Sequence, residues 1–326
     1  MLRSLSLDGA IRKHRIEPSG FTFAEVSQRW FAQQMERVDT VKKRQISLET
    51  NAYRLAALLK LLGHMDIATI GEDQVTMVQR VRLKVGKAPA TINSETRLLK
   101  QIVKWALDKG LVSRELKVEK IPEPRRRIAL PTQKEVEAII AHLPEHTALL
   151  VHLLGETGFR SGEAFHLEWS DLDFQQNAIS VQPKGPWTPK TQHSHRTVVV
   201  TPTLMQALQA ARAAYLATLA PGEQPSPLVF RGRGGGRVWD FRKALKTAII
   251  AAGVTRAGQP LHITPHMFRK AHATWLAEKG VNEALLQPRL GHAPGSRVTQ
   301  ESYVHVQSPE ALKATVISLD NYRRTA

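Results

Sequence analysis

The chain has 326 residues, of which 46 are lysine or arginine and 29 are aspartate or glutamate, giving a formal net charge of +17. Such an excess of positive charge indicates a polyanionic partner, with nucleic acid ahead of an acidic membrane surface. The absence of cysteine excludes disulfides, thiolate nucleophiles and cysteine-ligated zinc. Neither the apolar core of a signal peptide nor an apolar run long enough to span a bilayer is present, so we expect a cytoplasmic protein.

The first part of the chain has a helical pattern. Residues 1–20 are polar and basic without a sustained period, and we interpret them as an N-terminal arm. Residues 21–112 repeat apolar side chains at helical spacing, which predicts a small all-α domain. Its helices are expected to open at a capping box formed by Thr22 and Glu25, and then to cover residues 53–63, 72–83 and 91–110. The apolar face of the helix at 53–63 is expected to consist of Tyr53, Leu55, Leu58, Leu59 and Leu62.

Residues 113–131 have the composition of an interdomain linker. They contain three prolines among alternating charges, and proline breaks helices and favours extended chain. Within this segment, Arg125-Arg-Arg127 either contacts the phosphates of a duplex or is ordinary linker solvation, and the sequence favours neither.

Residues 132–326 are predicted to form one larger domain of mixed α/β structure. A second capping box, Thr132 with Glu135, opens it, and a tail helix near residues 309–319 ends it. The fold class predicted for the whole chain is therefore mainly α with a small β-sheet. In this domain we expect helices near residues 133–142, 146–157, 203–219, 238–252, 265–279 and 283–290, and strands at 178–182, 196–200 and 228–230.

Two cationic side chains of this domain could bind phosphate. Arg160 lies in Glu156-Thr-Gly-Phe-Arg-Ser-Gly-Glu163, where it can be partly buried with Glu163 as its orienting partner, and its planar fork suits two phosphate oxygens. Lys190 lies in the loop between the two expected strands, where a flexible lysine can reach into a groove. Taken alone, Arg160 is better explained by a surface ion pair with Glu163, and Lys190 carries little information because hairpin loops are commonly charged.

A second set of candidates follows on the expected helix at 265–279 and beyond it. His266 and Arg269 are three residues apart, so they share one face of a helix that starts at Pro265. His292 follows in Leu290-Gly-His292, and Tyr303 comes eleven positions later. Such residues can orient a phosphodiester, exchange its protons and attack it without a metal. Each also has an ordinary structural explanation, a half-buried aromatic in the case of Tyr303.

The order of these residues resembles the active-site set of the tyrosine recombinases. This phage-integrase family includes the Xer and Cre recombinases and lambda integrase. The similar segments are TGFRSGE, TPKTQHSHRTV, TPHMFRKAHATWLAEKG and LLQPRLGHAPGSRVTQESYVHV, and the resemblance covers about residues 130–310. It extends more loosely to the helical domain. The interval between His292 and Tyr303 is slightly longer than in many relatives. The six matching positions are Arg160, Lys190, His266, Arg269, His292 and Tyr303.

The resemblance implies a fold and a mechanism. The fold would be an all-α SAM-like core-binding domain at residues 21–112 and a mixed α/β catalytic domain at 132–326, without a separate arm-binding domain. Tyr303 would attack a DNA phosphodiester, forming a 3′-phosphotyrosine and a free 5′-hydroxyl, while Arg160 and Arg269 contact the phosphate oxygens.

The resemblance also implies roles for the remaining site residues. His266 is the candidate base, Lys190 the general acid and His292 a hydrogen-bonding partner of the scissile phosphate. Neither ATP nor a metal would be required, because the tyrosyl bond stores the phosphoester energy.

Partners follow from the same resemblance. We expect double-stranded DNA recombination sites as the substrate, a homo-tetramer in the synaptic complex, accessory DNA-bending proteins and a location at the nucleoid. Two alternatives remain open at this point. A type IB topoisomerase-like enzyme would relax DNA by the same chemistry, and a non-catalytic DNA-binding protein could use the same scaffold.

Overall fold

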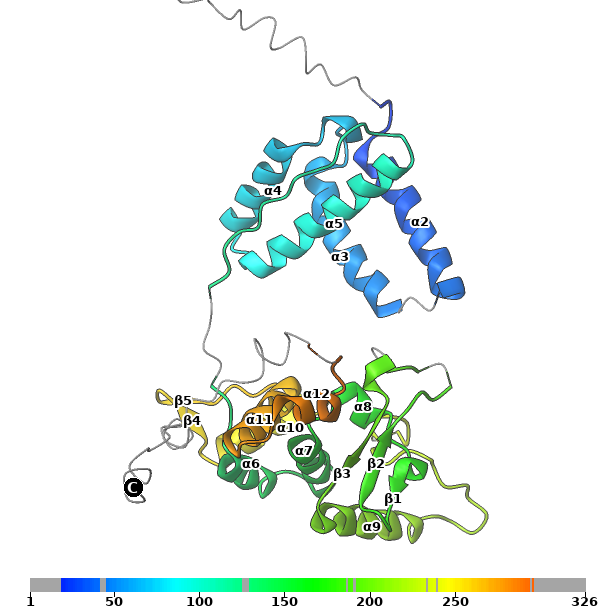
Figure 1. Cartoon of the computed structure of the whole chain (residues 1–326), viewed down its shortest axis with the longest axis vertical. Coiled ribbons are helices and arrows are strands. Elements are labelled where there is room, and N and C mark those ends of the chain that lie inside the picture. Colours follow the sequence, from blue (N-terminus) through cyan, green and yellow to red (C-terminus); the bar gives the residue numbers. More distant parts are fainter. Residues whose placement is uncertain are drawn as a thin grey trace, which may run out of the picture. The chain divides into compact units, whose positions relative to one another are not determined.

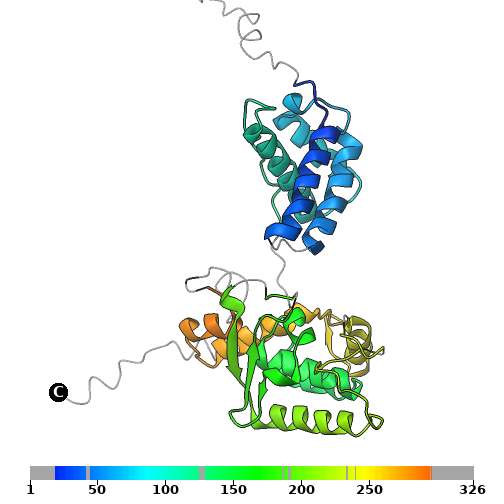
Figure 2. The ribbon, with the colours of Figure 1, turned by 90° about the vertical axis from the view of Figure 1, so that its right-hand side faces the viewer.

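The computed structural model describes residues 19–41, 45–124, 129–185, 187–189, 192–232, 234–238, 240–293 and 295. The chain divides into two compact units, residues 1–126 and 127–326. Helices dominate both units, and the strands lie in the second (Figures 1 and 2). The predicted fold class, mainly α with a small β-sheet, is confirmed. In the described ranges, no helix is both long and apolar enough to cross a membrane.

The first unit is a small helical domain. The predicted capping box is present, because the Thr22 amide donates to Glu25 Oε2 at 2.7 Å and the Glu25 amide donates to Thr22 Oγ1 at 3.3 Å. The helices are α2 (Phe23–Val41), α3 (Gln45–Leu62), α4 (Glu72–Lys84) and α5 (Pro89–Asp108), with a short 3₁₀ turn, η1 (Ile67–Thr69), between α3 and α4.

Helix α3 differs from the prediction in its start, which is Gln45 rather than residue 53, and in the face on which Tyr53 lies. Tyr53 was expected to mark the apolar face of this helix, but its side chain is 83% exposed. The residues buried from α3 are Leu48, Leu55, Leu58 and Leu62. Because successive residues of a helix turn by about 100°, Tyr53 lies on the face opposite to these leucines.

The segment after α5 stays on the first unit as far as Glu123. Val112 and Leu116 are buried in the core of this unit. The Asn93 side chain makes two hydrogen bonds with the backbone of Ile121, accepting from its amide and donating to its carbonyl, both at 2.9 Å. Arg125-Arg-Arg127, considered above as a phosphate contact, lies outside the described residues.

The second unit places helices around one central helix and beside a small sheet. Three antiparallel strands lie in the order β1-β2-β3, with Val181 opposite Arg196 and Ala178 opposite Val199. A separate two-stranded hairpin joins β4 and β5. The helices are α6 (Gln133–Ile140), α7 (Glu145–Thr157), α8 (Ser161–Phe165), α9 (Pro202–Leu216), α10 (Arg242–Ala251), α11 (Pro265–Glu278) and α12 (Glu283–Leu290). The strands are β1 (Leu172–Asp173), β2 (Ala178–Val181), β3 (Arg196–Val199), β4 (Thr255–Arg256) and β5 (Gln259–Pro260), with 3₁₀ turns η2 (Trp169–Asp171) and η3 (Gln192–Ser194).

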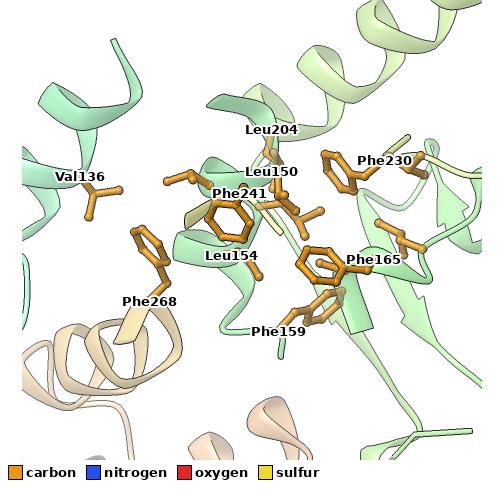
Figure 3. Packing of buried hydrophobic residues seen from close by; sticks show 14 of the residues in the cluster. Val136, Leu150, Leu154, Phe159, Phe165, Leu204, Phe230, Phe241 and Phe268 are labelled. Atoms are coloured by element: carbon orange, nitrogen blue, oxygen red, sulfur yellow. The ribbon is translucent and has the colours of Figure 1, made fainter. Parts of the chain in front are cut away.

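The core of the second unit is built around α7. This helix packs against α6, α9 and α11, and its apolar side chains, such as Leu150 and Leu154, are buried. Phenylalanines from five other segments surround them (Figure 3). Fully burying one such ring contributes roughly 2–3 kcal/mol. The rings are those of Phe159, Phe165, Phe230, Phe241 and Phe268. This packing fixes the end of α7, next to which the site residues lie.

Several elements of the second unit differ from the prediction, including the short strand β1, which was not expected. The segment 228–230 is not a strand, because Leu228 forms only an isolated bridge with Glu168. The side chains of Val229 and Phe230 are buried in the core. The β4–β5 hairpin was not predicted: it turns through Ala257 and Gly258, both with positive φ, and an Ala-Gly pair lacks the usual asparagine or aspartate signal. The helix expected from residue 238 begins at Arg242. The tail helix expected at 309–319 lies outside the described residues.

Candidate active site

Two helices end beside each other at the candidate site, and both end in a left-handed glycine. Gly158 follows α7 and Gly291 follows α12, each with φ 65°. A Cβ on Gly158 would lie 2.7 Å from the ring of His272, and one on Gly291 would lie 2.9 Å from a guanidinium nitrogen of Arg196. Glycine is therefore required at both turns by backbone conformation and by space.

Arg269 lies at the junction of these two helix ends. It comes from the second turn of α11, which starts at Pro265 as predicted, and it is fully buried. Nη1 donates to the carbonyl of Gly158 at 2.9 Å, and Nη2 donates to the carbonyl of Leu290 and, at 2.8 Å, to His292 Nε2. Carbonyls at helix C-termini lack partners within the helix and carry partial negative charge, so they suit a buried guanidinium.

His292 is held in one protonation state by this contact. Arginine can only donate, so His292 Nε2 accepts and the neutral ring carries its hydrogen on Nδ1. Burial, with the guanidiniums of Arg269, Arg160 and Arg196, lowers the pKa of His292 to about 4. The ring is therefore neutral at physiological pH.

Arg160 stands at the start of α8, two residues after Gly158. Its Nη1 donates to Glu163 Oε1 at 2.7 Å and to Ser194 Oγ at 3.2 Å. The side chain remains 24% exposed, whereas that of Glu163 is 3% exposed. The expectation that Glu163 orients Arg160 agrees with these contacts. An arginine that is oriented by a buried carboxylate and still partly exposed to solvent can present its remaining donors to a phosphate.

Glu163 is shared with a second arginine, Arg196, which the sequence did not indicate. Arg196 Nη2 donates to Glu163 Oε2 at 2.9 Å, and its Nε donates to the carbonyl of Arg289 in α12 at 2.7 Å. Burial alone would raise the pKa of Glu163, but the guanidiniums of Arg196 and Arg160 lower it below its usual range. One carboxylate between two guanidiniums leaves the site positively charged. In the sequence, Arg196 is marked only by its position at the first residue of β3. Many strands begin with a charged residue, so this position does not identify a site residue.

His266 shares α11 with Arg269 and lies one turn before it. Its side chain is exposed, in contrast to the buried Arg269. The four described candidates thus include two with exposed surface, Arg160 and His266, and two that are buried, Arg269 and His292. Hydrogen bonds join into one network the side chains of Arg160, Glu163, Arg196, Arg269 and His292 and the end of α12.

Two of the six candidates, Lys190 and Tyr303, lie outside the described residues. The hairpin on which Lys190 is expected has a second lysine, Lys184, that the structure does describe. Its ammonium pairs with Asp171 and donates to the carbonyl of His166 at 3.0 Å. Because the Asp171 side chain is fully buried, Lys184 has a structural role at the base of the hairpin. In the ranges that the structure describes, no group of three or more potential ligands could hold a metal ion.

Comparisons with known proteins identify the family of the chain. Residues 131–310, more than half of the chain, match the pattern described as "Phage integrase family". The "Tyrosine recombinase XerD" of Mycobacterium leprae is 28% identical over 275 residues, which cover 76% of this chain and 82% of that protein. The "Tyrosine recombinase XerC" of Mycobacterium sp. (strain JLS) is 28% identical over 272 residues, covering 77% and 86%.

Solved structures show a similar fold. The Tn1549 transposon integrase, in complex with a circular intermediate DNA, has a TM-score of 0.71 at 18% identity and covers 90% of this chain and 98% of its own. A lambda integrase dimer bound to a COC′ core site has a TM-score of 0.68 at 15% identity, covering 89% and 97%. At these identities the likeness concerns the fold.

Proposed function

Because the chain belongs to the phage integrase family, we propose that it is a tyrosine recombinase that breaks and rejoins DNA at specific sites through a covalent bond to Tyr303. The observation that supports this function best is the network of Arg160, Arg269 and His292 at the meeting of two helix ends. It collects positive charge and hydrogen-bond donors, as the transition state of phosphoryl transfer requires.

The chemical step needs no cofactor. The phenolic oxygen of Tyr303 forms a bond to phosphorus, and the bond from phosphorus to the 5′-oxygen breaks. His266 accepts the phenolic proton, and Lys190 donates a proton to the leaving 5′-oxygen. Rejoining reverses these steps, since the phosphotyrosine preserves a phosphoester bond.

The arginines and His292 stabilise the transition state. Arg160 and Arg269 bind the non-bridging oxygens, and each such donor contributes about 3–4 kcal/mol. His292 hydrogen-bonds the same phosphate as a neutral ring. Its low pKa supports this role, because the neutral ring neither gains nor loses charge as the phosphate reacts.

The substrate of this reaction is double-stranded DNA. The net charge of +17 supports a polyanionic partner. In this proposal the helical unit binds the duplex as a core-binding domain, and four copies assemble on two sites. A solved lambda integrase tetramer bound to a Holliday junction, with a TM-score of 0.67 at 16% identity, supports such an assembly. The enzyme would then act at the nucleoid, with DNA-bending proteins as accessory factors.

The test is to trap covalent protein–DNA. Footprinting on the DNA that flanks the gene identifies a bound site, and a nick placed just 3′ of the cleavage position turns it into a suicide substrate. Wild type should retain a 5′-end label in a protein adduct, while Tyr303→Phe should bind the DNA without forming one. The function is refuted if wild type gives no adduct on a bound site, or if Tyr303→Phe gives as much. Relaxation of plasmids that lack the site, without recombinants, would instead favour the topoisomerase-like alternative.

The general acid has a separate test. Lys190→Ala should cleave slowly on an ordinary substrate, because the 5′-oxygen then leaves without a proton. A 5′-bridging sulfur leaves without needing that proton, so a phosphorothiolate substrate should restore cleavage by Lys190→Ala. Restoration should be absent in Arg160→Ala, which lacks a phosphate contact. Equal defects of Lys190→Ala on both substrates would contradict the assignment.

A further inference from the structure

Behind Arg269 and His292 lies a second pair of side chains, His272 and Arg289. His272 follows Arg269 by three residues on α11, and its ring is 4% exposed. Its Nδ1 contacts the carbonyl of Gly155 at 3.0 Å, and its Nε2 lies 3.0 Å from Arg289 Nε. Since arginine can only donate, Nε2 accepts and Nδ1 donates. The structure therefore requires a neutral ring with its hydrogen on Nδ1.

Arg289 connects three elements of the second unit. It belongs to the last turn of α12, and besides His272 it donates to the carbonyl of Glu156 in α7 at 3.1 Å and to that of Val199 in β3 at 3.2 Å. Its own carbonyl accepts from Arg196. A shift of Arg289 would therefore move the end of α12, from which Gly291 and His292 follow.

These contacts complete the C-terminal end of α7. Its carbonyls after Leu154 have no further turn of helix to accept from, and an unpaired buried carbonyl is costly. His272 donates to the carbonyl of Gly155 and Arg289 to that of Glu156. Arg269 donates to that of Gly158, in the turn that follows the helix. The side chain that binds phosphate and the pair behind it thus hold one backbone turn together.

We propose that His272 and Arg289 are positioning residues of the strand-exchange reaction, which hold the ends of α7 and α12 so that Arg269 and His292 face the scissile phosphate. The inference rests on the proposed recombinase function. Neither residue needs to touch DNA. A displacement of about 1 Å at a reacting centre can lower the rate by about 10²-fold, so the loss of one of these contacts should be visible in catalysis.

Two substitutions of His272 separate its two hydrogen bonds. Asparagine places an amide group near the position of Nδ1 and can keep the bond to Gly155, but it cannot reach Arg289. Glutamine extends to the position of Nε2 and can accept from Arg289. If the contact with Arg289 positions the site, His272→Asn should cleave about 10–100-fold more slowly and His272→Gln should stay within a few-fold of wild type. His262→Asn, at an exposed position of the same unit, is the matched control.

The assay is single-turnover cleavage of the suicide substrate at saturating protein, with the DNA dissociation constant and the thermal unfolding midpoint measured in parallel. For His272→Asn we expect a slower cleavage rate with DNA affinity within about two-fold of wild type. A wild-type rate in His272→Asn overturns the proposal. So does an equal loss in both His272 variants together with loss of DNA binding, which marks a purely structural role. If His272→Asn does not fold, Arg289→Lys takes its place, and a wild-type cleavage rate there overturns the proposal.

A chemical rescue gives a second readout. His272 and Arg289 both line a cavity of about 670 Å³ between α6, α7, α11 and β3. Imidazole could enter from this cavity into the space left in His272→Ala and accept from Arg289. Imidazole should accelerate cleavage by His272→Ala and leave wild type and Arg289→Lys unchanged. Acceleration of all three, or of none, contradicts the proposed contact. If wild type itself forms no adduct, the proposed function fails rather than this inference.

Discussion

The two buried histidines of the second unit should make the fold sensitive to acid. Burial and the guanidinium of Arg289 lower the pKa of His272 to about 3, and burial with three nearby guanidiniums lowers that of His292 to about 4, whereas an unfolded histidine titrates near 6.5. As pH falls below 6.5, the unfolded chain takes up protons that the folded chain does not, so stability is lost. From 6.5 to pH 5 the difference is about 1.5 pH units, or about 2 kcal/mol per histidine at about 1.4 kcal/mol per unit.

Two measurements test this magnitude. Ring resonances of His272 and His292, assigned by comparison with substituted variants, should show no titration between pH 5 and 8. Urea unfolding should show that the free-energy difference between wild type and His272→Gln changes by about 2 kcal/mol between pH 7 and pH 5, in favour of the variant at low pH. His262→Gln, at an exposed position of the same unit, is the control variant. A titration of either buried ring near pH 6.5, or a difference independent of pH, would refute the reasoning.

Three further predictions concern single contacts. Arg269→Lys should lower cleavage by about 10²–10³-fold at saturating DNA, because one ammonium cannot match the guanidinium fork; unchanged single-turnover rates would contradict this. Lys184→Met removes the cation from the fully buried carboxylate of Asp171 and should lower the free energy of unfolding by about 3–5 kcal/mol, measured in urea. A loss below about 1 kcal/mol would contradict this, because it would mean that the pair contributes little. Gly158→Ala should lower the free energy of unfolding more than Gly280→Ala. Both glycines have positive φ, but only a Cβ at position 158 meets another side chain, the ring of His272 at 2.7 Å. Equal losses in the two variants would contradict the steric argument.

The sequence predicts those parts of the fold that depend on neighbouring residues. The capping boxes at Thr22 and Thr132 form as expected, because each needs only residues three positions apart. The start of α11 at Pro265 follows from the same local rule. The hairpin β4–β5 was missed because its turn uses alanine at a position with φ 49°. Tyr53 was placed on the wrong face because a short apolar run does not fix the phase of a helix.

The site divides in the same way. Arg160 with Glu163, and His266 with Arg269, are pairs within one turn of helix, and their spacing was informative. Contacts between segments that are distant in the sequence have no characteristic spacing, so the sequence did not predict them. Arg196 meets a carbonyl 93 residues away, and Arg289 meets one 133 residues away. Nothing in the local sequence of either arginine indicates its partner.

There is a physical reason why the partners of these cations are harder to predict than the cations themselves. A carboxylate partner, such as Glu163 beside Arg160, is a residue type that can be found in a sequence. The carbonyls of Gly158 and Leu290, which accept from Arg269, belong to the backbone, and every residue has one. Carbonyls at helix ends orient a guanidinium and stabilise its charge through partial charges, without the full negative charge that would neutralise it. A site that must bind a phosphodiester benefits from this choice, because the positive charge of Arg269 is kept for the transition state while its position is fixed.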